Sequence, residues 1–156
     1  MASLDTTFTS LDSDHLRTTM QTSEIHIPRK ITNQLLHLAQ LSPNAEICGL
    51  IGSVNGTPNR CYPIDNCAEH PETHFLLDAK QQIAAMKQIR DNGEELFAIY
   101  HSHPTAPAFP SPTDLEMASY PEALNLIISL NTKGVLEMRG FRITDKKALE
   151  VPLILA

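Results

Sequence analysis

The stretch Glu95-Leu-Phe-Ala-Ile-Tyr-His-Ser-His103, followed by Pro104 and then by Ser111-Pro-Thr-Asp114, decides the predicted fold. Its first part is apolar and rich in β-favouring residues, which predicts a buried strand. Pro104 cannot continue the hydrogen bonding of a sheet, so a loop is expected to begin there. A serine at the N-cap and a proline at the first helical position then predict a helix start, with Asp114 in its first turn.

This order of elements is expected to bring three metal ligands together. Side chains of a strand alternate between its two faces, so His101 and His103 are expected on the same face. The strand that carries them turns back into a helix start that carries the Asp114 carboxylate. Two nitrogens and one oxygen suit Zn²⁺, and a set of only three protein ligands leaves a position for water, as in catalytic sites.

A simpler interpretation exists for each part of this set. A His-x-His pair alone is more often only the polar side of a strand, and Ser111 and Asp114 alone can be a helix cap and a first-turn carboxylate favoured by the helix dipole. The conjunction of the histidine pair, the proline-rich loop and the carboxylate favours the metal interpretation.

The pattern His101-Ser-His-Pro104, six further residues and then Ser111-x-x-Asp114 resembles the signature of the JAMM (MPN+) metallopeptidase family. That signature also contains an upstream glutamate, and Glu46 stands at the corresponding place. The likeness extends from about residue 24 onward and is strongest to small stand-alone bacterial members, including the CysO-cysteine peptidase type. The resemblance implies an α/β fold in which helices flank a mixed β-sheet, related to the cytidine-deaminase layout.

The expected chemistry is zinc-dependent hydrolysis of an amide bond, with one Zn²⁺ on His101, His103 and Asp114. Zinc lowers the pKa of bound water from 15.7 to about 7. Glu46 is expected to act as the general base that takes the proton of this water and delivers it to the leaving amine. Ser111 Oγ is expected to donate to the oxyanion, a role that competes with helix capping.

Two residues in or beside these motifs also have a purely structural interpretation. Without the metal motif, Glu46 would be interpreted as a polar residue at the boundary of an element. Ser102 is expected to face away from the two histidines and to be a supporting or packing residue.

Length and composition predict one globular domain at residues 23–156. Residues 1–22, rich in Thr, Ser and Asp, are expected to form a disordered tail. A net charge of −6 argues against a nucleic-acid or anionic-membrane partner, and no apolar run reaches transmembrane length. Three cysteines without C-x-x-C spacing predict reduced thiols in a cytoplasmic protein.

The remaining elements follow from periodicity, caps and turns. A capping box at Asp78 and Gln81 is expected to open a helix that buries Ile83, Met86 and Ile89. Helices are expected over 29–41, 78–92 and 112–119, and strands over 24–28, 47–54, 60–64, 95–103, 123–130, 135–143 and 149–155, with turns at Asn55-Gly56 and Lys133-Gly134.

The resemblance also implies a substrate. Family members commonly cut after a Gly-Gly terminus, and the segment 66–78 resembles one that flanks their active-site groove. Predicted elements fill most of the sequence after Asp114, which leaves no room for the insertions of eukaryotic ubiquitin-chain enzymes. A small ubiquitin-like sulfur-carrier protein is therefore the expected partner, with cysteine or a short extension as the leaving group.

Four rival functions remain to be weighed. A deubiquitinase-like deconjugase would use the same ligands on another substrate, and a non-catalytic MPN-type scaffold would bind partners after losing its metal ligands. Iron oxygenases with two histidines and a carboxylate share the ligand types but usually form an all-β barrel. A zinc deaminase would need H-x-E and P-C-x-x-C, which this sequence lacks. The oligomeric state is not predicted.

Overall fold

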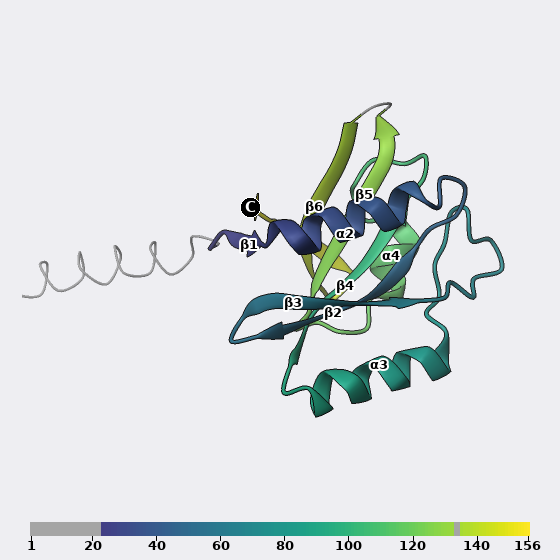
Figure 1. The fold of residues 1–156 in the computed structure, drawn as a ribbon. Helices are drawn as coiled ribbons and strands as arrows, with labels where there is room; N and C mark the ends of the chain where they lie inside the picture. The colour runs from purple at the N-terminus through teal and green to yellow at the C-terminus, as the bar shows by residue number, and fades with distance from the viewer. Residues whose placement is uncertain (1–22, 133–134) are drawn as a thin grey trace, which may run out of the picture.

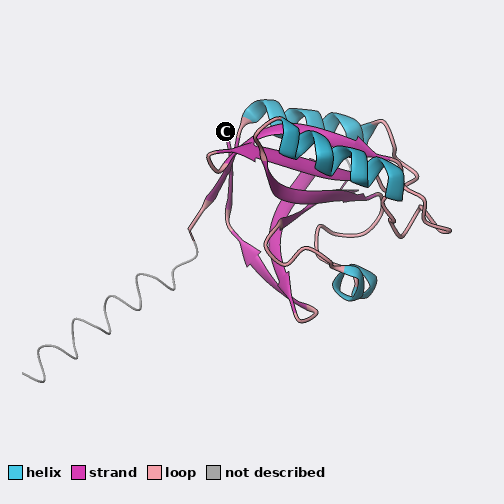
Figure 2. Ribbon diagram, turned by 90° about the horizontal axis from the view of Figure 1, so that it is seen from below, coloured by secondary structure: helices cyan, strands magenta, loops and turns pink. Residues whose placement is uncertain are grey.

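A mixed six-stranded sheet with helices on both faces forms the centre of the fold (Figures 1 and 2). The computed structural model describes residues 23–132 and 135–156. The strand order is β3-β2-β4-β5-β6-β7; β4 and β5 are parallel, and the other neighbours are antiparallel. The predicted α/β class is therefore confirmed. The expected tail over 1–22 and the expected turn at residues 133–134 lie outside the described residues.

The bounds of the elements follow in chain order: β1 (Ile25–Ile27), α2 (Arg29–Gln40), β2 (Cys48–Val54), β3 (Thr57–Ile64), α3 (Ala79–Asp91), β4 (Glu95–His103), α4 (Pro112–Met117), β5 (Leu124–Thr132), β6 (Val135–Thr144), β7 (Lys147–Val151) and β8 (Leu153–Leu155). β1 and β8 pair in parallel as a second sheet, so the first and last described strands lie side by side (Figure 1). Within the described ranges, no helix has the length and apolar character needed to cross a membrane.

Several predicted boundaries need correction, and the strand predicted over 60–64 begins at Thr57. The single strand predicted over 149–155 is wrong, because Pro152 has no N–H for a ladder and divides it into β7, which pairs with β6, and β8, which pairs with β1. The helix predicted to reach Ser119 already ends at Met117. β4, by contrast, spans the predicted residues.

The buried face of α3 also differs from the prediction. Asp78 caps the helix by accepting from the Gln81 N–H, as expected, but the Gln81 side chain bonds Asp65 instead of closing a capping box. Ile83 is 71% exposed, whereas Ala85 and Ile89 are buried. Met86 is partly buried against the same cluster, so the prediction is right for Met86 and Ile89 and wrong for Ile83, whose place on the buried face is taken by Ala85.

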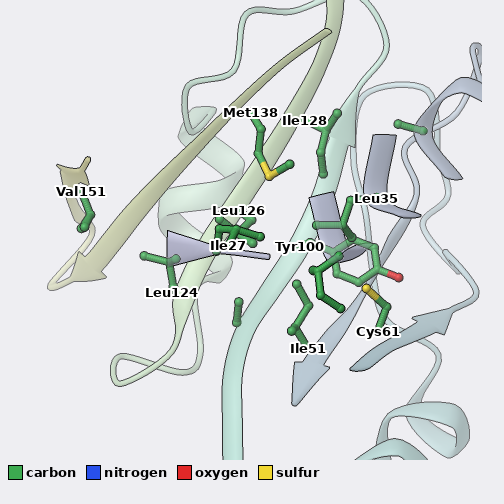
Figure 3. Close-up of a cluster of buried hydrophobic side chains, with 13 residues drawn as sticks. Ile27, Leu35, Ile51, Cys61, Tyr100, Leu124, Leu126, Ile128, Met138 and Val151 are labelled. Carbon is green, nitrogen blue, oxygen red and sulfur yellow. The ribbon is translucent and has the colours of Figure 1, made fainter. Parts of the chain in front are cut away.

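The two faces of the sheet have separate cores. On one face, α2 packs Ile31, Leu35 and Ala39 against strands β2 to β5, and Figure 3 shows Leu35 close to Tyr100. On the other face, α3 packs against a cluster that includes Ile99. Because neighbouring residues of β4 alternate between these cores, His101 and His103 continue the face of Ile99, on the α3 side of the sheet.

Candidate active site

The end of β4 and the start of α4 bring three polar atoms together. His101 Nε2, His103 Nε2 and Asp114 Oδ2 lie 3.1 Å from one another in each of the three pairs. Both histidines are at least 97% buried. Two ligands of a tetrahedral zinc ion with bonds of about 2.0 Å lie about 3.3 Å apart, so the spacing and the N/N/O chemistry of these donors fit Zn²⁺.

The loop between β4 and α4 is anchored at two points, and this returns α4 to the strand end. Ala108 is fully buried in a cluster with Ile127 and Phe141. The Ser129 hydroxyl of β5 donates to the Ala106 carbonyl at 2.7 Å. The proline-rich sequence thus leaves the sheet, packs on its surface and re-enters the site at Ser111.

The start of α4 has the predicted capping arrangement. Ser111 Oγ accepts from the Asp114 N–H at 3.0 Å, and the Ser111 N–H donates to Asp114 Oδ2 at 2.9 Å. A hydroxyl offers two lone pairs and one proton, so capping occupies an acceptor position and leaves the O–H free to donate. The two expected roles of Ser111 therefore use different parts of the same group.

Glu46 reaches the cluster through the register between β2 and β4. Cys48 pairs with His101 in this antiparallel ladder, and the same register places Glu46 opposite His103. Side chains opposite one another on paired strands share a face. Glu46, His101 and His103 are buried and each offers one potential ligand atom within 4.8 Å of the other two, so these three residues could also hold a metal ion.

The two carboxylates of the site differ in their proton affinity. Burial raises the pKa of Glu46 to about 7, an effect that nearby His103 opposes. Burial would also raise the pKa of Asp114, but hydrogen bonds with His101 and His103 hold it well below its usual range. One carboxyl therefore exchanges a proton near neutral pH, while the other stays ionised.

The two histidine rings are held in different ways. His103 Nδ1 lies 2.8 Å from the Pro107 carbonyl, so Nδ1 carries a proton in either charge state of the ring. Burial opposes the charged ring, but hydrogen bonds with Asp114 and Pro107 raise the pKa of His103, and the cationic ring donates from Nε2 to Asp114. When the ring is neutral, its Nε2 lone pair faces the cluster and can bind a metal. His101 Nδ1 is buried and has no hydrogen-bond partner among the described residues. Its ring instead stacks on Phe75, with centroids 4.3 Å apart and an angle of 21° between the planes. Burial lowers the pKa of His101, which favours the neutral imidazole that binds metals.

Asn66 ties the loop before α3 to the Glu46 segment. Its Nδ2 donates to the carbonyls of Glu46 (3.0 Å) and His74 (2.9 Å), and its Oδ1 accepts from the N–H groups of Ala68 and Leu76. All the main hydrogen-bonding positions of this side chain are thus used. From the sequence, the segment 66–78 was expected to flank a groove, but nothing in it indicated that Asn66 holds the carbonyl of Glu46.

An apolar pocket of about 240 Å³ opens beside the cluster. Its walls include His101 and Asp114 together with Phe75, Leu76 and Met117. The side chains of Leu76 and Met117 are about half exposed, so these apolar walls are open to solvent. Of the segment 66–78, residues 75–77 line this pocket.

Comparison with known proteins identifies the family. A model described as prokaryotic homologs of the JAB domain matches residues 28–143, which is most of the chain. The chain belongs to this family. Among its relatives, CysO-cysteine peptidase of Mycobacterium tuberculosis is 31% identical over 125 residues, covering 79% of this chain and 85% of the relative. A probable TtuB-protein conjugate cleaving protease of Thermus thermophilus is 33% identical over 97 residues, covering 62% and 64%.

Solved structures of similar proteins have the same fold. Protein DSY2949 from Desulfitobacterium hafniense superposes with a TM-score of 0.74 at 32% identity, covering 84% of this chain and 92% of that one. AF2198, a JAB1/MPN domain protein from Archaeoglobus fulgidus, gives a TM-score of 0.54 at 16% identity, with 85% and 99% covered. The expected JAMM/MPN fold is confirmed.

Proposed function

We propose that this JAB-domain protein is a zinc-dependent peptidase that cleaves the amide bond after the C-terminal Gly-Gly of a small ubiquitin-like sulfur-carrier protein. The observation that carries the proposal is the triangle of His101 Nε2, His103 Nε2 and Asp114 Oδ2, with a second carboxyl, that of Glu46, buried beside it. A site with three ligands and an adjacent base is the arrangement of catalytic zinc centres.

We assign Asp114, not Glu46, as the carboxylate ligand. Asp114 Oδ2 already lies 3.1 Å from both histidine nitrogens and stays ionised at neutral pH. A pKa of about 7 makes Glu46 better suited to accept and release a proton, since general bases work best when their pKa is near the operating pH. The alternative set, with Glu46 as the third ligand, would leave only Asp114 as a base, and its pKa is too low for it to hold a proton near neutral pH.

In the proposed reaction the side chains divide the work. A zinc ion held by His101, His103 and Asp114 would supply Lewis-acid chemistry, which lowers the pKa of water from 15.7 to about 7. Glu46 takes a proton from the attacking water and passes it to the leaving nitrogen as the C–N bond breaks. The Ser111 hydroxyl donates to the substrate carbonyl oxygen as negative charge develops on it, while its lone pair still caps α4.

The groove and the relatives support the choice of substrate. The pocket beside the ligands is open and apolar, which fits an extended, flexible tail better than a folded surface. The names of the relatives refer to CysO-cysteine and to TtuB-protein conjugates. We favour a free amino acid or short extension as the leaving group because the more extensive match is to the CysO-cysteine peptidase. A conjugate-cleaving activity is the second candidate, supported by the TtuB relative.

We place the reaction in the cytoplasm, where the three free cysteines would stay reduced.

The test offers three substrates to the zinc-loaded protein and measures the masses of the products. Purified carrier-Gly-Gly-Cys, carrier-Gly-Gly and linked di-ubiquitin are incubated separately, with a chelated sample as the control. Release of carrier-Gly-Gly from the first substrate alone supports the proposal. Preferential cleavage of di-ubiquitin would make the protein a deconjugase, and no cleavage of any substrate would favour a non-catalytic scaffold.

A further inference from the structure

Ser102 lies between the two proposed histidine ligands and has no place in the chemistry described so far. Its side chain points to the opposite face of β4 and is completely buried. Its Oγ accepts a hydrogen bond from the N–H of Ile47 at 2.9 Å, and its own N–H donates to the Ile47 carbonyl at 3.0 Å. Ile47 is the residue directly after Glu46, so Ser102 holds the chain at the proposed base.

The hydroxyl replaces an ordinary ladder bond. In an antiparallel sheet, a hydrogen-bonded pair exchanges two N–H···O=C bonds between the backbones. At the Ile47–Ser102 pair only one of the two is a backbone bond, because the Ile47 N–H bonds the Ser102 side chain. The other bond of the pair has an ordinary length of 3.0 Å, so the Ser102 hydroxyl and N–H together tie Ile47 to β4 just before β2 begins at Cys48.

Glu46 lies one residue beyond this pair, and its backbone N–H and carbonyl bond to residues outside β4. Its N–H donates to the Pro71 carbonyl at 2.7 Å, and its carbonyl accepts from Asn66 Nδ2 at 3.0 Å. The Glu46 side chain lies opposite His103, and the neighbouring Ile47–Ser102 pair ties this part of the chain to β4. We propose that Ser102 is a positioning residue whose hydroxyl sets the distance between the Glu46 carboxyl and the metal ligands. This inference rests on the proposed function.

The first experiment follows amide hydrogen exchange in the zinc-loaded protein, and it does not depend on activity. In Ser102→Ala the Ile47 amide should exchange at least about 10-fold faster, because its acceptor is lost. The Glu46 amide, bonded to Pro71, is the internal control and should not change. Ser102→Thr, which keeps the hydroxyl, should restore the protection of Ile47. Unchanged Ile47 exchange in Ser102→Ala would overturn the inference, whether or not the protein is a peptidase.

The second experiment measures kinetics and zinc affinity for the same two variants. Ser102→Ala should lower kcat about 10–100-fold with KM and zinc affinity unchanged, and Ser102→Thr should recover most of kcat. A residue that only packs the strand would instead weaken zinc binding, since it lies between both histidines, and that result would overturn the positioning role. So would a normal kcat in a variant that has lost protection at Ile47. No hydrolysis by the wild-type protein would overturn the proposed function and the catalytic part of this inference, while the exchange result decides separately whether Ser102 holds Ile47.

Discussion

The buried carboxyl of Glu46 should make the metal-free protein less stable as the pH rises. Its pKa is about 7 in the folded protein against an ordinary value of 4.5, so between these values the folded state binds more protons than the unfolded state. Stability then falls with rising pH across this window and levels off above it. At 1.36 kcal/mol per pKa unit, the full effect is about 3 kcal/mol at pH 8 and above.

Glu46→Gln removes the ionisable carboxyl, so the loss of stability at high pH that it causes should disappear. The free energy of unfolding is measured with urea from pH 4.5 to pH 8.5 for chelator-treated wild type and variant. Across this range, the variant should gain about 2–3 kcal/mol of stability relative to the wild type. Groups that titrate in both proteins largely cancel in this difference.

Glu94→Gln is the matched control. Glu94 is also buried, but its side-chain oxygens accept from Asn59 and Tyr62, so its replacement should destabilise the protein by removing an acceptor. Parallel curves for wild type and Glu46→Gln would refute the reasoning, because they would show that Glu46 has the same pKa in the folded and unfolded states.

Three further predictions concern the site. Zinc-loaded Glu46→Gln should hydrolyse carrier-Gly-Gly-Cys about 10²–10⁴-fold more slowly, and near-native turnover would remove Glu46 from the mechanism. Phe75→Ala should weaken zinc binding about 10–100-fold in chelator competition, because His101 loses its stacking partner. Leu76→Ala is the control and should leave zinc affinity unchanged. Equal zinc affinities of the two variants would show that the stacking on Phe75 does not orient the His101 ring. Asn66→Asp should lower the free energy of unfolding by about 2 kcal/mol, since two carbonyls would lose their donor and face a carboxylate; an unchanged urea midpoint would contradict this.

The parts of the site that follow from local rules were predictable from the sequence. Strand alternation places His101 and His103 on one face, and the Ser-Pro helix start places Asp114 in the first turn of α4. These arguments need only neighbouring residues. The convergence of the two elements depended on the loop after Pro104 turning back, which the burial of Ala108 explains.

Other features depend on long-range pairing that local pattern does not determine. Glu46 was placed at the site only by resemblance, because the register that puts it opposite His103 joins strands about 50 residues apart. The roles of Asn66 and Phe75 depend in the same way on where a loop packs. The interruption by Pro152 was visible in the sequence and should have divided the last strand.

The most direct test of the account is the zinc content of Asp114→Asn and Glu46→Gln, measured side by side with the wild type. Both variants remove one carboxylate beside the same two histidines, so they separate the two possible three-ligand sets. With Asp114 as the ligand and Glu46 as the base, Glu46→Gln should retain about one zinc per chain, like the wild type, and Asp114→Asn should lose it on dialysis. Zinc retained by Asp114→Asn and lost by Glu46→Gln would contradict the assignment.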